Sequence, residues 1–244
     1  MKTTSHVKKL FLGKLLAPAI SAIGIAVFFA PAAQAAVLVA IPDDAAIQSN
    51  TPDTNYGSAT SIFSYYRNIT GQPYYKSWVK LNATSLPSLI SGNTTLSLTA
   101  SNATVGYTID FYLLSGVDSS TWNEGTITWN NAPGNNIGGA GFTGGANATL
   151  IGSFTSYTFV ANTTYGLSIT GAGETALLSA LNTGNRTATI AFQRTVSGTS
   201  VNNFWSTEAT TSSYLPTFTA VPEPSTFALI GLGMAAVVCF RRRK

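Results

Sequence analysis

The 244 residues include 13 Lys or Arg and 9 Asp or Glu, which gives a formal net charge of +4. Most of the basic charge lies at the two ends: residues 36–221 carry five basic and eight acidic side chains, a net charge of −3. This excludes the basic surface on which nucleic-acid binding depends. His6 and Cys239 are the only histidine and cysteine, so residues 36–221 hold no disulfide, no Cys or His zinc site and no Ser-His-Asp triad.

The N-terminal segment has the pattern of a secretory signal peptide. Lys8 and Lys9 precede a mostly apolar stretch over residues 15–30, and Ala33-Gln34-Ala35 supplies a small-x-small site. A basic start, an apolar stretch and such a site are the three parts of a cleavable signal. We predict a signal peptide over residues 1–35, cleaved after Ala35, and export of the remaining chain. An uncleaved anchor is the alternative.

A second apolar stretch lies near the C-terminus. Residues 225–240 are uncharged and are followed by Arg241, Arg242, Arg243 and Lys244. A helix of this length measures roughly 24 Å, which spans a hydrocarbon core of about 30 Å with help from flanking residues or local thinning. The basic cluster is expected to stay in the cytoplasm and to leave the middle of the chain outside. The sequence therefore predicts one transmembrane helix here.

Pro222, Glu223 and Pro224 stand immediately before this stretch. The order of Pro-Glu-Pro, apolar span and basic tail resembles the PEP-CTERM sorting signal. The resemblance implies that residues 222–244 are an anchor cut by an exosortase-type membrane protease, and that the chain reaches the outer surface or extracellular matrix of an exopolysaccharide-producing Gram-negative bacterium. The sorting motif then consists of Pro222, Glu223, Pro224, Arg241, Arg242 and Arg243. A permanent single-span anchor in the inner membrane is the alternative.

Residues 36–221 show the period-two alternation of β-strands, with Gly, Asn and Pro clusters between the alternating segments. One short helix is expected over residues 174–181, with Gly184 as its stop signal. We predict an all-β domain, built as a two-sheet antiparallel β-sandwich of the jelly-roll type. The inward residues are expected to be Val79, Leu81, Leu96, Leu98, Val105, Tyr107, Ile109, Phe111, Leu113, Ile190 and Phe192.

Four segments of this domain occur in a characteristic order. They are residues 44–57, ending in Asn55-Tyr56-Gly57; residues 76–82; residues 122–133, Trp-Asn-Glu-Gly-Thr-Ile-Thr-Trp-Asn-Asn-Ala-Pro; and Trp205-Ser-Thr-Glu208 followed by Tyr214-Leu-Pro216. Together they resemble the DNRLRE-type domain, a family related to carbohydrate-binding modules, over about residues 40–220. The resemblance implies an exported, non-catalytic jelly-roll sandwich, which in some members binds polysaccharide.

Aromatic residues on polar segments are the candidates for glycan binding, because flat rings cover the apolar C–H faces of sugars and leave their hydroxyl groups to neighbouring polar side chains. Trp78 and Lys80 share the strand face opposite Val79 and Leu81, an arrangement that suits an acidic polysaccharide. The alternative is an outer face covered by a loop. The candidate residues are Tyr56, Tyr65, Tyr66, Tyr74, Trp78, Lys80 and Trp205.

Trp122 and Trp129 flank Glu124 in the most specific of the four segments. We interpret the two rings as core residues and Glu124 as an acceptor for backbone N–H groups, because large aromatic side chains usually lie in cores. The alternative is that a ring stacks on a sugar while Glu124 binds its hydroxyl groups.

Calcium is the metal that this composition permits, since it takes oxygen ligands and needs neither Cys nor His. We select Asp44, Asp118 and Glu124 as candidate Ca²⁺ ligands. Their spacing matches no EF-hand loop, and solvated surface acids are the alternative. No other cofactor is expected.

The leading hypothesis is an exported, non-enzymatic module that binds extracellular polysaccharide or cell-envelope glycan. One alternative is a structural matrix or adhesion protein that contacts other proteins. A less favoured alternative is a glycan hydrolase, which requires two facing carboxylates such as Glu124 and Glu208.

Overall fold

The structure is a computed structural model that describes residues 35–222, apart from residues 68, 70, 88, 116–120 and 143–147. The chain divides into two units, residues 1–33 and residues 34–244, and all described residues belong to the second. The predicted signal peptide, the apolar span 225–240 and the sorting-motif residues Glu223, Pro224, Arg241, Arg242 and Arg243 lie outside the described residues. Within the described part of the chain, no helix is long and apolar enough to cross a membrane.

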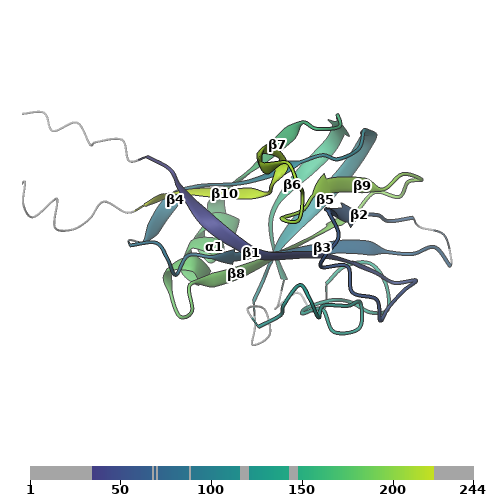
Figure 1. Cartoon of the computed structure of the whole chain (residues 1–244), viewed down its shortest axis with the longest axis horizontal. Coiled ribbons are helices and arrows are strands. Elements are labelled where there is room, and N and C mark those ends of the chain that lie inside the picture. Colours follow the sequence, from purple (N-terminus) through teal and green to yellow (C-terminus); the bar gives the residue numbers. More distant parts are fainter. Residues whose placement is uncertain are drawn as a thin grey trace, which may run out of the picture. The chain divides into compact units, whose positions relative to one another are not determined.

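The described residues form ten strands, one α-helix and a single 3₁₀ turn, which confirms the all-β prediction with one short helix (Figure 1). The strands are β1 (Val37–Gln48), β2 (Ser61–Ser64), β3 (Tyr75–Asn82), β4 (Ile90–Thr99), β5 (Thr104–Leu114), β6 (Ala148–Phe159), β7 (Thr164–Ile169), β8 (Thr187–Arg194), β9 (Asn202–Trp205) and β10 (Thr217–Pro222); the helix is α1 (Gly171–Asn182) and the 3₁₀ turn is η1 (Ser212–Tyr214).

Eight strands join in one antiparallel sheet in the order β6-β5-β8-β3-β1-β10-β4-β7, and β2 pairs with β9 in a separate ribbon. The prediction of an antiparallel two-sheet arrangement is confirmed only in part, because β1 pairs in both halves and joins them into one sheet. Strand β1 joins the two halves: Val37–Val39 pair with β10, whereas Asp43–Gln48 pair with β3. The change of partner occurs between Val39 and Ala40, which already pairs with Asn82 of β3, and Pro42, which has no N–H to donate, lies in the irregular stretch between Ala40 and Asp43.

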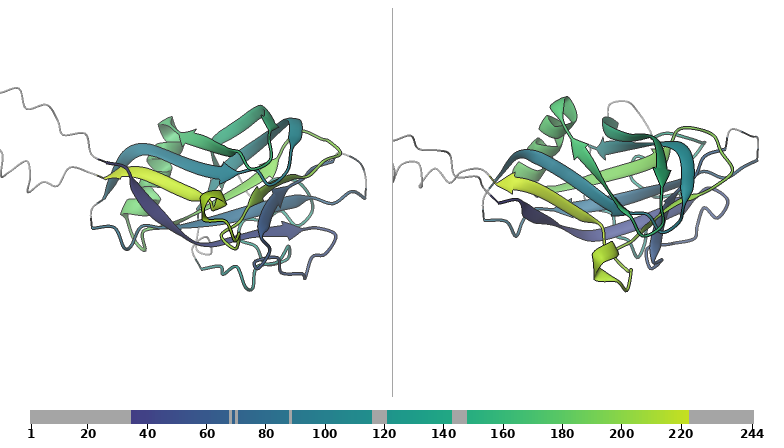
Figure 2. Two further views of the ribbon diagram at one scale, coloured as in Figure 1. Left: turned by 45° about the horizontal axis from the view of Figure 1, so that its top comes forward. Right: turned by 90° about the horizontal axis from the view of Figure 1, so that it is seen from above.

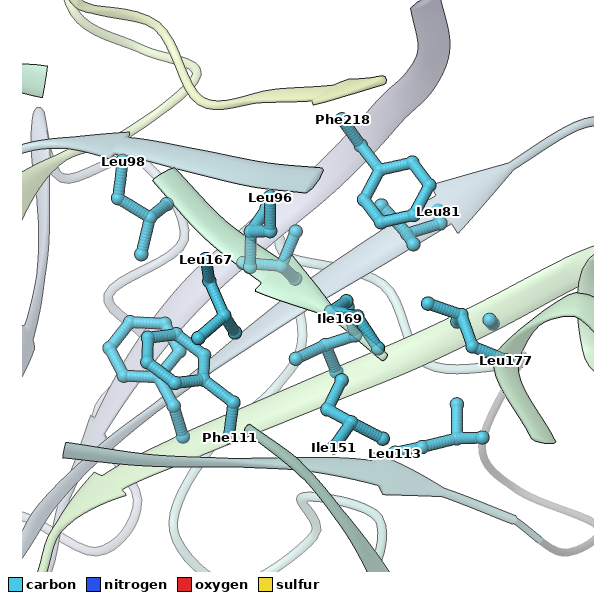
Figure 3. Close-up of a cluster of buried hydrophobic side chains, with 14 of the residues drawn as sticks. Leu81, Leu96, Leu98, Phe111, Leu113, Ile151, Leu167, Ile169, Leu177 and Phe218 are labelled. Carbon is cyan, nitrogen blue, oxygen red and sulfur yellow. The ribbon is translucent and has the colours of Figure 1, made fainter. Parts of the chain in front are cut away.

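The single sheet folds back on itself until its two edge strands meet. Gly152 of β6 lies under the side chain of Leu167 of β7, so closely that a Cβ at Gly152 would be 3.0 Å from Leu167 Cδ1. The result is a nearly closed sheet whose inner surface is lined by large apolar residues (Figure 3). Phe111 packs against Phe154 and Phe192, with ring centroids 5.1 and 5.0 Å apart.

The predicted alternation holds in the centre of the strands and fails at one bulge. Ile109, Phe111 and Leu113 are buried as expected, but on the same strand Val105 is 67% exposed and Tyr107 is only half-buried. Gly106 adopts a φ of +74°, and the register of β5 with β6 shifts between Thr104 and Tyr107. The extra residue of this bulge turns Val105 to the outer face.

Helix α1 begins at Gly171, three residues before the predicted range, and Gly171 enters it with a φ of +64°. Gly173 is required for close packing, since a Cβ there would lie 2.8 Å from the Cα atom of Ile151. Leu177 and Leu181 are buried in the core, and Gly184 follows the helix with a φ of +54°. Glycines are typical of loops in a sequence, but here the absence of a side chain at Gly173 allows the helix to contact β6.

Candidate functional site

A second buried layer covers the outer face of β1, β3 and β8. It consists of Ala45, Ile47, Trp78, Ala191 and Leu114 on the strands, and of Trp122, Ile127, Trp129 and Ala132 on the loop between β5 and β6. The loop therefore covers the strand face on which Trp78 and Lys80 lie. The structure therefore agrees with the alternative of an outer face covered by a loop and not with an open glycan-binding face.

Trp78 is fully buried, and its Nε1 donates to the carbonyl of Pro133 at 3.1 Å. Lys80 forms an ion pair with Asp43 at 2.7 Å, lies 4.9 Å from the ring centroid of Trp122 and donates to the Trp122 carbonyl. Neither side chain is available to a ligand, so the predicted glycan contact by this pair is wrong. The alternation of a strand identifies its outward face, but it does not show whether a loop returns to cover that face.

The two tryptophans of the loop are core residues, as interpreted from the sequence. Trp122 donates from Nε1 to Thr189 Oγ1 at 2.9 Å, and Trp129 donates to the carbonyl of Ile137 at 3.1 Å. Both are less than a tenth exposed. Their polar N–H groups are satisfied inside the protein, which leaves no ring face for a sugar.

Lys76 fixes the glycine-rich part of this loop, a role that the sequence analysis missed. Its side chain is 1% exposed, and Nζ donates to Asn135 Oδ1 at 2.7 Å and to the carbonyls of Gly139 and Gly141 at 2.9 and 2.6 Å. It also lies 4.6 Å from the ring centroid of Trp129. Burial lowers the pKa of Lys76 to about 7, whereas the oxygen atoms and the ring face stabilise its charged form. Lys76 is a structural cation and is not exposed for binding.

The two segments that are most typical of the resemblance dock on each other. Asn55 donates from Nδ2 to the carbonyls of Glu124 and Ile127 at 2.5 and 2.7 Å. Gly57 follows in contact with Glu124, where a Cβ would lie 2.0 Å from the carbonyl oxygen. The Asn-Tyr-Gly turn and the Trp-x-Glu segment are therefore parts of one structural unit that closes this side of the module.

Three carboxylates meet beneath this unit. Asp44 is fully buried, its backbone N–H donates to Glu124 Oε2 at 3.3 Å, and its Oδ2 accepts from the N–H of Thr207 at 2.9 Å. Burial, followed by the charge of Glu208, raises the pKa of Asp44 to about 8. The pKa of Glu124 is also raised, by burial and then by the charge of Glu208. Glu124 and Glu208 thus come together in space, as the hydrolase alternative requires, but the group is held by backbone donors.

The calcium prediction is only partly within the described structure. Asp44 and Glu124 are neighbours, while Asp118 lies outside the described residues. Among the residues described, no three His, Cys, Asp or Glu side chains are arranged to hold a metal ion. Buried oxygens without a hydrogen-bond partner remain on Asp44 and Glu208. A structural Ca²⁺ held by Asp44, Asp118 and Glu124 therefore remains a prediction.

The outer side of the β2–β9 ribbon gathers partly exposed aromatic rings, and we call this surface the ribbon face. Residues opposite each other in an antiparallel pair share a face, so Phe63 and Asn203 lie on the same side as Ser61 and Trp205. The other side of the ribbon, with Ile62 and Phe204, is buried in the core. The ribbon face comprises Tyr56, Phe63, Tyr75, Trp205 and Tyr214.

The rings of the ribbon face support one another. Trp205 stacks on Tyr214 with centroids 5.7 Å apart and planes inclined by 12°, and its Nε1 donates to Asn162 Oδ1 at 3.2 Å. Phe63 contacts Tyr56 and Tyr75 edge to face, at 5.9 and 5.4 Å. The backbone of Phe63 is bound to the buried Ser77 of β3 by two hydrogen bonds. The N–H of Phe63 donates to Ser77 Oγ at 2.9 Å, and this hydroxyl group donates to the carbonyl of Phe63 at 2.8 Å. The aromatic surface is thus rigidly mounted on the main sheet.

Of the remaining predicted tyrosines, Tyr65 contacts Tyr75 of the ribbon face, with ring centroids 5.2 Å apart, but it is buried, and Tyr66 and Tyr74 form a separate stack. Tyr65 is only 8% exposed and lies near the Arg194 guanidinium, 5.9 Å from the ring centroid. Tyr66 stacks on Tyr74 at 5.6 Å, and Tyr74 on the buried Trp129 at 6.4 Å. Tyr56 and Trp205 are therefore the predicted residues that the structure brings to one exposed surface.

Sequence reasoning missed Phe63, Tyr75 and Tyr214 as members of the ribbon face. Phe63 follows the buried Ile62 and precedes the buried Ser64, so its alternation with both neighbours was a signal for an outward ring. Tyr214 is nine positions beyond Trp205 in the sequence, and only the η1 turn brings the two rings together.

Removing Trp78 is expected to destabilise the module much more than removing Trp205. Trp78→Ala leaves a cavity in the covered layer and should lower the free energy of unfolding by about 3–5 kcal/mol. Trp205→Ala removes a partly exposed ring and should cost about 1 kcal/mol or less. Equilibrium urea denaturation of both variants measures the difference. Equal losses would contradict the assignment of Trp78 to the interior and Trp205 to the surface.

Two segments of this chain match the models of known protein families. Residues 35–145 match the family model of carbohydrate-binding module family 96, and these residues contain β1 to β5, the covering loop and part of the ribbon face. Residues 220–244 match the PEP-CTERM protein-sorting motif, which agrees with the interpretation of the C-terminal sequence. Neither match is to an enzyme domain. No curated protein matches the chain.

Proposed function

We propose that this protein is an exported, non-enzymatic module that binds a neutral polysaccharide through the ribbon face. The observation that carries the proposal is the set of partly exposed rings on the β2–β9 ribbon, mounted beside the amide groups of Asn162 and Asn203. Rings of this kind cover the C–H faces of sugars, and amides bind their hydroxyl groups. The match of residues 35–145 to a carbohydrate-binding family supports the same function.

The distribution of charge favours a neutral glycan over the acidic one expected from Trp78 and Lys80. Of the five basic side chains in residues 36–221, four are engaged by groups of the protein itself: Lys76, Lys80, Arg186 and Arg194. Glu124 lies next to the turn that carries Tyr56, and Glu208 lies three residues after Trp205. A polyanion would therefore meet these two carboxylates near the ribbon face, where Arg67, three residues after β2, is the remaining basic residue.

The sorting motif completes the proposal. Its match at residues 220–244 supports export and processing by an exosortase-type protease, with the apolar span 225–240 as a transient or stable anchor in the inner membrane. The module is then displayed on the outer surface or in the extracellular matrix, where polysaccharide is its partner. Intact mass of the protein recovered from the producing cells and their medium tests both processing steps.

Affinity gel electrophoresis of residues 36–222 in gels that contain neutral or acidic polysaccharides tests glycan binding. We expect retardation by a neutral polysaccharide, little dependence on salt, and a loss of affinity of about tenfold for Trp205→Ala, since one stacked ring contributes on the order of 1 kcal/mol. Tyr157→Ala is the matched control, because Tyr157 is 38% exposed and lies on β6, outside the ribbon face. Equal effects of the two substitutions, or retardation only by acidic polymers, would contradict the proposal.

A further inference from the structure

We infer that one end of the module rests on a lipid surface, and we call it the tail end. It is formed by the start of β1, the loop that leads into β4 and the end of β10, which lie side by side in both views of Figure 2. The inference rests on the sorting assignment of residues 220–244 and is independent of glycan binding.

The first argument is that no spacer separates the sheet from the sorting signal. Pro222 is the last residue of β10, where it is paired with Ile90 of β4, and it is also the first residue of the Pro-Glu-Pro motif. Ser91 Oγ lies within 3.3 and 3.4 Å of the carbonyl oxygens of Val221 and Pro222. The apolar span 225–240 therefore begins within three residues of the folded sheet. If that span enters a bilayer, the sheet is held at its surface.

The second argument is the chemistry of this end. Leu38 of β1 is 65% exposed and Leu89 is 42% exposed, and Leu38 pairs with Thr219 of β10. The three segments that form and adjoin the tail end, residues 35–42, 83–99 and 209–222, contain no charged residue. Contact of these segments with the interfacial region of a membrane thus buries apolar area, and the nearest charged residue in the sequence on the C-terminal side is Glu223.

The charged side chains that touch these segments are already engaged. Glu174 of α1 accepts from the N–H of Thr94 at 3.2 Å, and Arg186 donates to the carbonyl of Leu86 at 3.0 Å. An apolar, uncharged surface at the point where the chain enters an apolar and then basic segment fits a phospholipid bilayer as its partner.

The geometry also sets the distance of the ribbon face from the lipid. Strand β4 runs from Ile90 at the tail end to Thr99, and its ten residues span about 30 Å. Immediately beyond Thr99, Ala100 forms a bridge with Phe204 of β9, so the ribbon lies at the far end of β4. A module that rests on its tail end therefore holds the ribbon face about 30 Å from the lipid, within reach of extracellular polymer.

The test uses the full chain in vesicles of phosphatidylethanolamine and phosphatidylglycerol, with Cys239→Ser and a fluorophore on a single new cysteine. Ser85→Cys places the probe on the exposed loop before β4, and Thr163→Cys places it on an exposed turn at the far end. We expect an aqueous quencher to quench the Ser85 probe in vesicles at no more than half the rate that is measured in detergent. The reason is that a membrane surface beside the probe removes roughly half of the directions from which the quencher can approach. The Thr163 probe should show no such change.

Two further variants test the cause of the shielding. Leu38→Asp combined with Leu89→Asp should abolish it, whereas Val105→Asp, at an equally exposed position near the far end, should leave it intact. A Gly/Ser spacer of about ten residues after Pro222, with an r.m.s. length of ~17 Å, should also abolish it. Vesicle flotation, measured on every sample, should be unchanged.

Each other outcome overturns the inference. If the protein floats with the vesicles but the two probes are quenched equally, the chain is anchored and the proposed contact of the tail end with lipid is wrong. Shielding in native membranes but not in pure lipid assigns the tail end to a membrane protein instead. Failure of the unmodified chain to float overturns the anchor and the lipid contact together. Glycan binding is measured separately by gel retardation, so failure of that function is distinguished from all three.

Discussion

Asp44→Asn is expected to stabilise the module near pH 8 and to have little effect near pH 4. The pKa of Asp44 is raised from 3.8 to about 8, first by burial and then by the charge of Glu208. Between these values the folded state keeps a proton on Asp44 that the unfolded state has released, so the contribution of Asp44 to the free energy of unfolding falls as the pH rises, and this contribution levels off above pH 8. At 1.36 kcal/mol per pKa unit the loss is on the order of 5 kcal/mol. Asparagine has the shape of the neutral acid and removes this dependence.

Urea denaturation across this pH range measures the effect. Asp53→Asn makes the same chemical change at an exposed position and should differ little from the parent at any pH. A parent protein whose stability stays flat between pH 4 and pH 8 would refute the assignment. Added Ca²⁺ tests the calcium prediction in the same experiment. If a metal neutralises these carboxylates, Ca²⁺ near pH 8 should stabilise the parent and leave Asp44→Asn unchanged.

Gly57→Ala is expected to destabilise the module by about 3 kcal/mol or more. The new Cβ would lie 2.0 Å from the carbonyl oxygen of Glu124 and 2.4 Å from its carbonyl carbon, and backbone atoms do not yield as a flexible side chain does. The turn has to withdraw, and Asn55 then loses its bonds to the carbonyls of Glu124 and Ile127.

The matched control is Gly139→Ala in the covering loop. Its Cβ would be 3.7 Å from the hydroxyl oxygen of Tyr74, an ordinary contact, and its backbone needs no left-handed conformation. Thermal unfolding of both variants, followed by near-ultraviolet circular dichroism, compares them directly. If Gly57→Ala unfolds at the same temperature as Gly139→Ala, the two segments do not dock as described.

The strands were predictable because alternation is a local property of the sequence. Leu96 with Leu98, and Ile190 with Phe192, are buried as the pattern indicates. The prediction for Val105 is wrong because the bulge at Gly106 shifts the alternation by one residue. A glycine within an alternating segment suggests a bulge, but it does not indicate which neighbouring residue points outward. The sequence does not show that the two halves of the sheet join. They join because β1 pairs with both β3 and β10, and these pairings connect residues that are far apart in the sequence.

The candidate site was predictable only in part, and burial explains the difference. Lys76 and Lys80 indicate an outward face, because lysine is rarely buried, yet a loop that supplies carbonyl groups and tryptophan rings covers both. Trp205 is a candidate from the sequence and is partly exposed, but its partner Tyr214 comes from a separate turn. Tertiary structure decides which aromatic residues share a surface, and composition does not.

The place of β10 in the sheet has a mechanical consequence. This strand lies between β1 and β4 and is antiparallel to both. A pull applied beyond Pro222, while the opposite end of the module is held, acts along the strand, so the hydrogen bonds of both ladders bear the load together in shear. Peeling, which breaks bonds one at a time, would require β10 to be an edge strand. The strand that leads to the sorting signal is therefore built into the part of the fold best suited to resist tension.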